Sequence, residues 1–479
     1  MTRPRAAPHT NPALVFGFLA LAGMVFAMLQ SLVAPALPTM AADLRTSTAD
    51  ISWLVTAYLL AAAVATPIAG RLGDMFGRRR VLLIVLGLLA TGALVAALAG
   101  NLAVLVTGRV LQGAGGAILP LAFGIVRDEL PRERVGVAVG LLSALLGTGG
   151  GLGSVLAGPI TEHLSWHWLF WFPLIMIAVA AAGIAYGIPE SPVRASDRID
   201  VPGALLLSSG LVCLLLALSK GDGWGWTSGT ALGSLGGAAV VLATWVVVEL
   251  RVRAPLVDMR MLANRGVWTT NIAGISFGVV TFGSFLLVPL LLQLPTATGY
   301  GHGKSVSEAG LYLLPASMAM VVFAPLSGVL DRHFGAKLPL TLGILMAAAS
   351  FVLLAVAHDA AWHILTAVTM IGIGIGLGSS AMTNAILATV PPTQTSVATS
   401  INTLARTIGG SIGTAVLAAI LSATTSARHV PSEAGFTAGF WMCAGALGVA
   451  FLAALMLPAG RRRWVVQPSD ASPGRRSGP

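Results

Sequence analysis

The chain has 479 residues, of which 56% are hydrophobic and only 10% are charged. Soluble domains carry about 25% charged residues, so this composition excludes an ordinary soluble protein and indicates one that lives in lipid. The two cysteines, Cys213 and Cys443, both lie in apolar stretches and offer no disulfide framework.

Apolar stretches long enough to cross a membrane recur along the whole chain. A bilayer core about 30 Å thick needs roughly 20 apolar residues in a helix. The stretches lack the alternation of barrel strands, and unpaired backbone groups cannot face hydrocarbon, so we expect an all-α membrane protein. The first stretch follows Arg3 and Arg5 as in a secretory signal, but it is too long for one, so we expect an uncleaved helix. The fourteen predicted spans are 13–38, 51–70, 81–100, 102–126, 136–160, 167–189, 200–219, 230–250, 268–292, 308–330, 338–357, 361–388, 397–421 and 436–458.

The basic residues fall mostly on one side of these spans. With both termini in the cytoplasm, 22 of the 28 Lys and Arg residues lie on the inner side, four lie outside, and Arg109 and Arg406 fall within spans. This distribution follows the positive-inside rule and predicts cytoplasmic N- and C-termini. The formal net charge of +10 therefore indicates a face that meets anionic lipid, and no nucleic-acid partner is expected. The use of 25 Arg against 3 Lys, with abundant Ala and Gly, favours a bacterial source and a plasma (inner) membrane location.

A short charged hairpin follows the second span and recurs in the second half of the chain. Residues 70–80 read Gly-Arg-Leu-Gly-Asp-Met-Phe-Gly-Arg-Arg-Arg, and a looser copy, Gly-Val-Leu-Asp-Arg-His-Phe-Gly, begins 258 residues later. Glycine allows the close approach and unusual dihedrals of a tight turn, while Asp74 can pair with Arg78 or cap a neighbouring helix. Such a contact can latch one helix bundle against another and break when the bundles rock. The residues assigned to this conformational motif are Gly70, Gly73, Asp74, Gly77, Arg78, Asp331, Arg332 and Gly335.

The hairpin resembles the signature loop of the major facilitator superfamily, which joins the second and third helices of that fold. Four further segments are similar to the fourteen-helix drug:proton antiporter branch of the family, namely Ala36–Pro38, Ser52–Leu60, Arg109–Gly113 and Asn402–Ser411. The resemblance implies a secondary active transporter that exports drugs or small metabolites by alternating access, usually driven by inward proton flow. A proton-coupled or facilitative importer of a small organic solute is the alternative, and it differs in direction rather than in fold.

The repeated hairpin divides the chain into two similar halves. We expect an N-terminal six-helix bundle over 13–190, a linker with two extra spans over 191–265, and a C-terminal six-helix bundle over 266–460. The tails, 1–12 and 461–479, are rich in Pro, Ser and Arg and are expected to be disordered in the cytoplasm. Paired halves favour a shared site near the midplane, with one bundle rocking against the other.

Glycines crowd the fifth span. Rows spaced by four residues leave one side of this helix almost bare, which permits close backbone approach to another helix. The resemblance implies the antiporter motif of drug exporters, at the seam between the bundles, although Ser154 stands where the family usually has Pro. Generic tight packing is the alternative. The motif comprises Gly147, Gly149, Gly150, Gly153, Ser154, Gly158 and Pro159.

Two arginines lie within predicted spans. An Arg at the bilayer centre costs at least about 2.5–3.5 kcal/mol, so Arg109 and Arg406 are expected to face the bundle interior with polar partners. Gln112 and Asn402 lie one turn away on the same faces. The resemblance makes Arg109 a candidate proton relay, and Asp74, nearer the membrane edge, is a second candidate. A hydrogen-bonded staple between helices is the alternative for both arginines.

No acid is expected at mid-depth in the membrane. Leu29 stands where the family has a membrane Asp, and all 18 Asp and Glu residues fall in loops, tails or helix ends. A buried carboxylate would both attract cationic drugs and carry a proton. Without one, we expect a cavity that favours neutral or anionic compounds, with Arg109 and Arg406 supplying positive potential. Proton coupling would then use a group nearer the edge, such as Asp74, or a protonatable substrate.

Several polar and aromatic residues are candidates for lining this cavity, although each alone is more typical of packing or of a lipid-facing surface. They are Gln30, Trp53, Thr56, Tyr58, Gln112, Asn271, Phe282, Asn384, Asn402 and Arg406.

Catalytic and nucleotide-binding motifs are absent from the sequence. There is no G-x-x-x-x-G-K-[ST] loop, no H-E-x-x-H and no paired C-x-x-C. We therefore expect neither an enzyme nor an ATP-driven pump, and no cofactor or metal. The expected partners of the monomer are a small-molecule substrate, protons and the lipid bilayer.

Overall fold

The computed structural model describes residues 12–191, 199–425 and 431–458. Fourteen of its helical segments are long and apolar enough to cross a membrane, which confirms the predicted all-α fold. The elements are α1 (Pro12–Asp43), α2 (Thr48–Ile51), α3 (Trp53–Phe76), α4 (Arg78–Ala97), α5 (Leu102–Gly113), η1 (Ala114–Ala117), α6 (Ile118–Glu129), α7 (Arg132–His163), α8 (Trp168–Gly187), α9 (Val201–Trp224), α10 (Gly229–Glu249), α11 (Met259–Leu262), α12 (Arg265–Gln293), η2 (Thr296–Thr298), α13 (Val306–Phe334), α14 (Lys337–Val356), α15 (Ala361–Thr389), η3 (Pro392–Gln394), α16 (Thr395–Ala423) and α17 (Glu433–Leu455).

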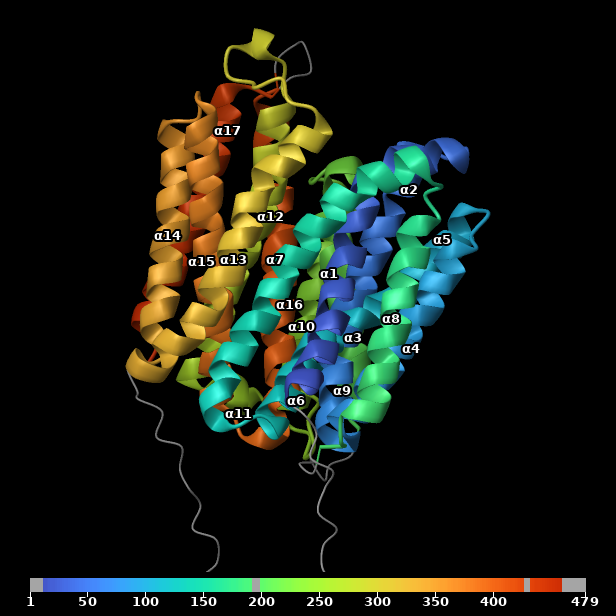
Figure 1. Cartoon of the computed structure of the whole chain (residues 1–479), viewed down its shortest axis with the longest axis vertical. Coiled ribbons are helices and arrows are strands. Elements are labelled where there is room, and N and C mark those ends of the chain that lie inside the picture. The colour runs from blue at the N-terminus through green and yellow to red at the C-terminus, as the bar shows by residue number, and fades with distance from the viewer. Residues whose placement is uncertain (1–11, 192–198, 426–430, 459–479) are drawn as a thin grey trace, which may run out of the picture.

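Two groups of helices stand side by side in the molecule (Figure 1). Helices α1 and α3 to α8 share one apolar core, which includes Leu29, Leu86 and Phe170. Helices α12 to α17 share a second core, which includes Phe351 and Phe440. We call these groups the N-terminal half and the C-terminal half.

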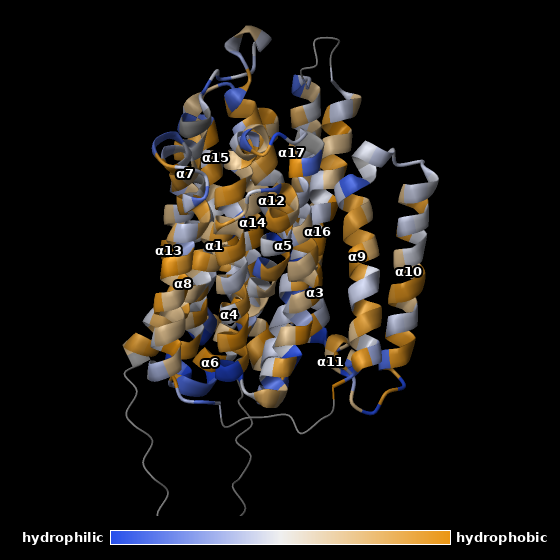
Figure 2. Ribbon diagram, turned by 90° about the vertical axis from the view of Figure 1, so that its right-hand side faces the viewer, coloured by the Kyte–Doolittle hydropathy of each residue, from blue (hydrophilic) through white to orange (hydrophobic). Residues whose placement is uncertain are grey.

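Helices α9 and α10 follow the first half in sequence but lie on the flank of the molecule (Figure 2). Leu211 of α9 and Trp245 of α10 belong to a third apolar cluster, which also contains Ala63 of α3 and Leu404 of α16. The cluster therefore spans both halves. Only 17% of the residues in the apolar stretch of α10 are buried inside the protein. Most residues of this helix therefore face outward.

The fourth predicted span, 102–126, corresponds to one membrane-spanning segment, Leu102–Glu129. The four-residue 3-10 turn η1 lies inside it, between α5 and α6. Three glycines in and beside the turn make close contacts: a Cβ on Gly113 would lie 2.4 Å from Ala61 Cβ of α3, and a Cβ on Gly116 would lie 2.3 Å from Thr66 Oγ1. The prediction of one span is therefore confirmed, and glycines at the turn allow the close approach of α3.

Helix α7 is the main contact of the N-terminal half with α13. A Cβ on Gly140 would lie 2.2 Å from the carbonyl oxygen of Ala324, and one on Gly147 would lie 2.2 Å from Met320 Sδ. The backbones approach most closely near the start of α7 and the end of α13, at the end of the molecule that carries the hairpin of residues 70–80. We call this the hairpin end.

The opposite side of α7 packs within its own half. A Cβ on Gly149 would lie 2.7 Å from Ala27 Cβ of α1, and one on Gly153 would lie 2.1 Å from Ser31 Oγ. Cβ atoms on Gly150 and Gly158 would meet nothing within 4 Å. Pro159 lies inside the helix, and the side chain of Ser154 is outside the described part of the chain. The glycine motif thus divides between packing on α1, packing on α13 and positions where a Cβ would have free space.

The close approach of α7 and α13 leads to a prediction about Gly140. Because its Cβ would overlap a backbone carbonyl rather than a flexible side chain, Gly140→Ala should lower the free energy of unfolding by about 1–3 kcal/mol. Gly150→Ala is the matched control in the same helix, since its Cβ meets nothing within 4 Å. Thermal unfolding in detergent measures both variants, and equal melting temperatures would contradict close packing of α7 on α13 at Gly140.

Candidate functional site

The hairpin end is organised around the turn from α3 to α4. Gly77 has φ of 108°, a left-handed value that favours glycine. The carboxylate of Glu190 accepts hydrogen bonds from the backbone N–H groups of Arg79, at 3.2 Å, and Arg80, at 3.1 Å. It thereby satisfies donors in the first turn of α4 that have no partner within the helix. A Cβ on Gly77 would lie 2.4 Å from Glu190 Oε1, so the turn and its cap both require glycine.

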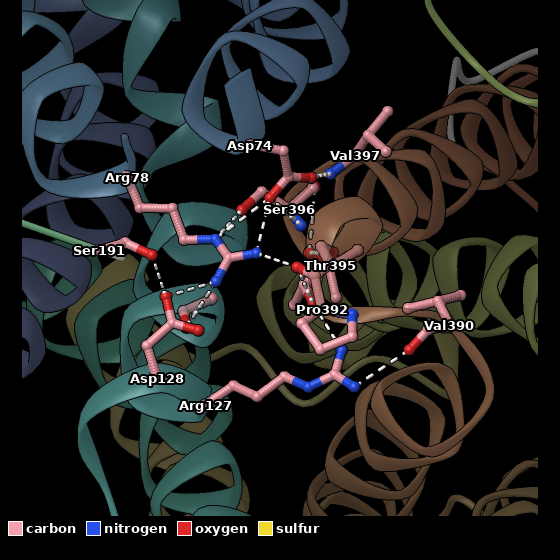
Figure 3. Close-up of polar contacts among 12 residues, drawn as sticks. Asp74, Arg78, Arg127, Asp128, Ser191, Val390, Pro392, Thr395, Ser396 and Val397 are labelled. Atoms are coloured by element: carbon pink, nitrogen blue, oxygen red, sulfur yellow. Dashed lines mark hydrogen bonds and ion pairs between the residues drawn. The ribbon is translucent and has the colours of Figure 1, made fainter. Parts of the chain in front are cut away.

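Arg78 lies at the centre of a buried polar network (Figure 3). Its guanidinium pairs with Asp74 at 2.8 Å and with Asp128 at 2.5 Å, and all three side chains are at most 5% exposed. Ser191 donates a hydrogen bond to Asp128 at 2.5 Å. Arg78 also donates to Ser396 Oγ at 3.1 Å and to the carbonyl oxygen of Pro392. Because Pro392 and Ser396 lie in the second half of the sequence, the network joins the two halves.

Asp74 makes the second connection between the halves. Its carboxylate accepts hydrogen bonds from the backbone N–H groups of Ser396, at 3.2 Å, and Val397, at 3.0 Å, in the first turn of α16. These donors have no partner within their own helix, and the helix dipole favours negative charge at this point. The two interactions expected for Asp74, pairing with Arg78 and capping a neighbouring helix, are therefore both present.

Arg127 makes the third connection. It donates to Thr395 Oγ1 at 2.5 Å and to the carbonyl oxygen of Val390 at 3.0 Å. Gly70 contributes by its lack of a side chain, since a Cβ there would lie 2.2 Å from Ser400 Oγ. Gly73 faces inward, where a Cβ would lie 2.2 Å from Leu121 Cδ2. We call the contacts of Asp74, Arg78 and Arg127 with residues 390–397 the latch.

The second hairpin has the same backbone but different chemistry. Gly335 has φ of 81° and ends α13 as Gly77 ends α3. Asp331 is buried at 4% exposure, whereas Arg332 is exposed. In the register set by the two glycines, Ala336 occupies the position of Arg78. The second hairpin therefore has no guanidinium at the position that centres the latch.

Arg109 lies inside the N-terminal half rather than at its surface, with 1% of its area exposed. It donates to the carbonyl oxygens of Leu54, at 3.1 Å, and Leu29, at 3.2 Å, and to Gln112 Oε1 at 2.8 Å. Its guanidinium carbon lies 4.1 Å from the centroid of the Tyr58 ring. Arg109 thus links α1, α3 and α5, and its contact with Leu29 is made by the backbone at the position where an acid was expected from the family pattern.

A second polar group lies in the C-terminal half. Asn402 of α16 donates to the carbonyl oxygen of Thr270, at 3.0 Å, and to Asn271 Oδ1, at 3.2 Å. Arg406, one turn further, is partly exposed and donates to Ser379 Oγ of α15 at 3.4 Å. The guanidinium of Arg406 is thus surrounded by neutral amides and hydroxyls. Phe282 packs nearby against α16, where a Cβ on Gly410 would lie 2.5 Å from its ring.

The remaining cavity candidates lie elsewhere. Thr56 Oγ1 is 2.9 Å from Ser219 Oγ of α9, and the ring of Trp53 lies 4.6 Å from Lys220 Nζ. These two residues therefore face the flanking helices. Asn384, fully buried, donates to the carbonyl oxygen of Gly136 at 3.4 Å and joins α15 to α7. Gln30 is partly exposed on α1.

Sequence reasoning missed several members of this site. Arg127, Asp128 and Glu190 stand at the ends of apolar stretches, where charged residues are ordinary. The available signal was the adjacent acid and base of Arg127-Asp128 directly after a long span. Ser396 carries no signal of its own, since its role depends on a partner 318 residues away.

Comparisons with known proteins agree with this architecture. The family model described as Major Facilitator Superfamily matches residues 19–414. This chain belongs to that superfamily. It is a multi-pass membrane protein of a family whose members transport small molecules, as the resemblance of the hairpin indicated.

Similar proteins include named exporters. The tetracenomycin C resistance and export protein of Streptomyces glaucescens is 31% identical over 373 residues, which cover 77% of this chain and 68% of that protein. The multidrug transporter protein MdtP of Bacillus subtilis is 30% identical over 377 residues, with the same two coverages of 77% and 68%. The crystal structure of the human organic anion transporter MFSD10 (TETRAN) superposes with a TM-score of 0.64 at 16% identity, covering 94% of this chain and 100% of that one. At that identity the last comparison supports the fold alone.

The latch leads to a prediction about Asp74. Asp74→Asn keeps the shape but leaves Arg78 and the first turn of α16 without the carboxylate; removing one member of a buried ion pair costs about 3–5 kcal/mol. We expect the hairpin end to open. Maleimide labelling of Thr399→Cys, which replaces a residue 3% exposed, should accelerate at least about tenfold in a background with Cys213→Ala and Cys443→Ala. Glu133→Gln, an exposed carboxylate at the same end, is the control. An unchanged labelling rate in Asp74→Asn would show that the carboxylate does not hold the two halves together.

Proposed function

We propose that this protein exports small organic molecules, drugs or metabolites, across the bacterial plasma membrane by alternating access. The proposal rests chiefly on the latch, a buried charged network that joins the two halves at the hairpin end. The names of the resistance and export proteins of Streptomyces and Bacillus support the direction of transport.

The arrangement of the halves supports a reversible closure. The N-terminal bundle (13–190) and the C-terminal bundle (266–460) act as the moving units, and residues 191–265 connect them. At the hairpin end, Gly70, Gly140 and Gly328 allow backbones of opposite halves to approach closely. In this state the path on that side is closed. Opening requires the latch to break, which exposes the charged groups of both halves to water and so limits their desolvation cost.

Orientation follows from the distribution of charge. Because the sequence predicts 22 of the 28 basic residues on the same side of the membrane as the hairpin, we assign that end, and both termini, to the cytoplasm. The conformation with its cytoplasmic side latched is then the one that releases an exported substrate outside. The protein acts in this scheme as a monomer and without enzymatic activity.

The substrate we propose is neutral or anionic. Arg406 is partly exposed in the C-terminal half among Ser379, Asn402 and Asn271, and no Asp or Glu lies in that group. A cation brought to this group would meet an uncompensated guanidinium in a medium of low dielectric, where like charges repel strongly. An anion would be attracted by the same charge.

Proton coupling, as we propose it, acts through the latch. Asp74 is buried in contact with both halves, so protonation would weaken its attraction to Arg78 and to the dipole of α16 together. Inward proton flow would in this way favour release of the cytoplasmic gate. Arg109, bonded to backbone carbonyls and Gln112 in place of an acid, supports the coupling only indirectly by holding α1, α3 and α5.

Transport of matched dyes tests the charge preference. In proteoliposomes with an imposed pH gradient, we expect proton-driven movement of an anionic dye and little movement of a cationic dye of similar size. Arg406→Gln should reduce the anionic flux about tenfold, because a hydrogen bond to a charged group contributes about 1.5–3 kcal/mol. Arg406→Lys should retain most of it.

The control for this experiment is Arg253→Gln, since Arg253 is exposed between α10 and α11, outside both hairpins and the polar group around Arg406. A preference for the cationic dye would refute the proposed substrate class. Net uptake of substrate into right-side-out cells down the proton gradient would refute export and favour the importer.

A further inference from the structure

The end of the molecule opposite the hairpins brings together three residues that the sequence keeps apart. His358 and Asp359 lie in the turn between α14 and α15, and Glu433 is the first residue of α17. One ligand atom from each lies within 4.8 Å of the others. Figure 1 shows the ends of α14, α15 and α17 gathered at the upper edge of the C-terminal half. Sequence motifs for metal sites are recognised by the spacing of their ligands, and these three residues match none of them. The sequence alone therefore predicts no metal site.

The surroundings of His358 determine which ring nitrogen carries the proton in the neutral imidazole. Its side chain is buried, with 4% of the residue exposed, and its Nδ1 lies 2.9 Å from the carbonyl oxygen of Leu354. A carbonyl can only accept, so Nδ1 carries the proton and donates. In a neutral imidazole Nε2 then presents a lone pair. A backbone carbonyl that orients a histidine in this way is the usual outer partner of a metal-binding imidazole.

The Nε2 atom faces a carboxylate without bonding to it. No hydrogen-bond partner of Nε2 exists among the residues that the structure describes, and Glu433 Oε1 lies 3.5 Å away. A charge-assisted hydrogen bond between these groups would be about 2.7–2.9 Å long. Either a proton on Nε2 or a metal ion between the two groups would turn this contact into an attraction.

The separation fits a shared metal ion. Zinc binds histidine nitrogen at about 2.0–2.1 Å and carboxylate oxygen at about 2.0–2.2 Å in tetrahedral geometry, which places two ligand atoms about 3.4 Å apart. The distance from His358 Nε2 to Glu433 Oε1 is 3.5 Å. Asp359 and Glu433 are exposed, so their carboxylates can adjust to complete the site and an ion can enter from water.

We propose that His358, Asp359 and Glu433 bind a divalent transition-metal ion of the zinc type, with water at the fourth position. One imidazole and two carboxylates suit zinc, cobalt or nickel, while the imidazole disfavours calcium and magnesium, which prefer oxygen ligands. The site lies apart from the latch and from the polar group around Arg406, and it does not depend on the proposed direction or substrate of transport.

The bound ion would tie together three segments at this end of the C-terminal half. The ligands join the α14–α15 turn to α17. The neighbouring segment after α12 is already attached to both, since His302 Nε2 is 3.0 Å from the carbonyl oxygen of His358 and the Tyr300 hydroxyl donates to the carbonyl oxygen of Pro431. A metal ion therefore stabilises the outer rim of this half against separation of its helices.

Calorimetric titration tests the proposal on the purified, untagged full-length protein after treatment with a chelator. Zinc chloride should bind with one-to-one stoichiometry and raise the melting temperature, because a ligand that binds only the native state stabilises it. Cobalt chloride should give visible absorption bands typical of tetrahedral coordination. Glu433→Gln and Asp359→Asn should each weaken zinc binding at least about tenfold, since loss even of an outer-shell partner costs about 10- to 100-fold in affinity.

The matched control is Glu162→Gln, which removes an exposed carboxylate at the same end of the N-terminal half and should leave zinc affinity unchanged. Each ligand variant should melt at the wild-type temperature when zinc is absent, which separates loss of the site from loss of folding. Absence of saturable binding by the wild type, or wild-type affinity in either ligand variant, would overturn the proposal. A melting temperature that falls in Glu433→Gln without zinc, with no zinc effect in the wild type, would identify a simple ion pair of His358 and Glu433 instead.

Discussion

The first turn of α16 presents backbone N–H groups that no residue of its own helix can satisfy, and a carboxylate from the other half of the molecule satisfies them. Asp74 would be costly to bury alone, and so would Arg78, but each supplies the charge that the other needs. The dipole of α16 adds to the attraction without requiring a side chain. The two halves therefore meet through a group of charges that is stable only while they are together.

The backbone makes this contact possible. Charged groups can meet only if the helices that carry them approach closely, and the glycines at positions 70, 140 and 328 remove the side chains that would separate them. Lipid provides no hydrophobic drive between helices, so close packing and polar contacts must supply the association. The association of the two halves at the hairpin end therefore depends on the glycines and the latch together.

The fold and part of the candidate site could be predicted from the sequence. Fourteen spans could be predicted because composition and length are local properties, and the hairpin could be recognised because Gly77, Asp74 and Arg78 lie within one turn. The 3-10 turn η1 inside the fourth span could not be predicted, since it depends on how that span packs against neighbouring helices. The partners of Arg78 in residues 392–396 could not be predicted either, because nothing local marks a serine or a proline carbonyl as the acceptor of a distant guanidinium. The isolation of Arg109 from the polar group around Arg406 likewise depends on how the helices pack, not on their hydropathy.

Helix α9 contacts both halves through apolar side chains, and it is joined to α3 by hydrogen bonds as well. Towards α3, Ser219 meets Thr56 at 2.9 Å and Lys220 donates to Ser52 at 2.8 Å. Towards α16, the described contacts are apolar and involve Leu404. Hydrogen bonds are directional and resist sliding of one helix along another. Apolar contacts are not directional, so they favour no single register between two helices. When the halves tilt, α9 and α10 should accordingly move together with α3. Their apolar surface should let α16 slide past them.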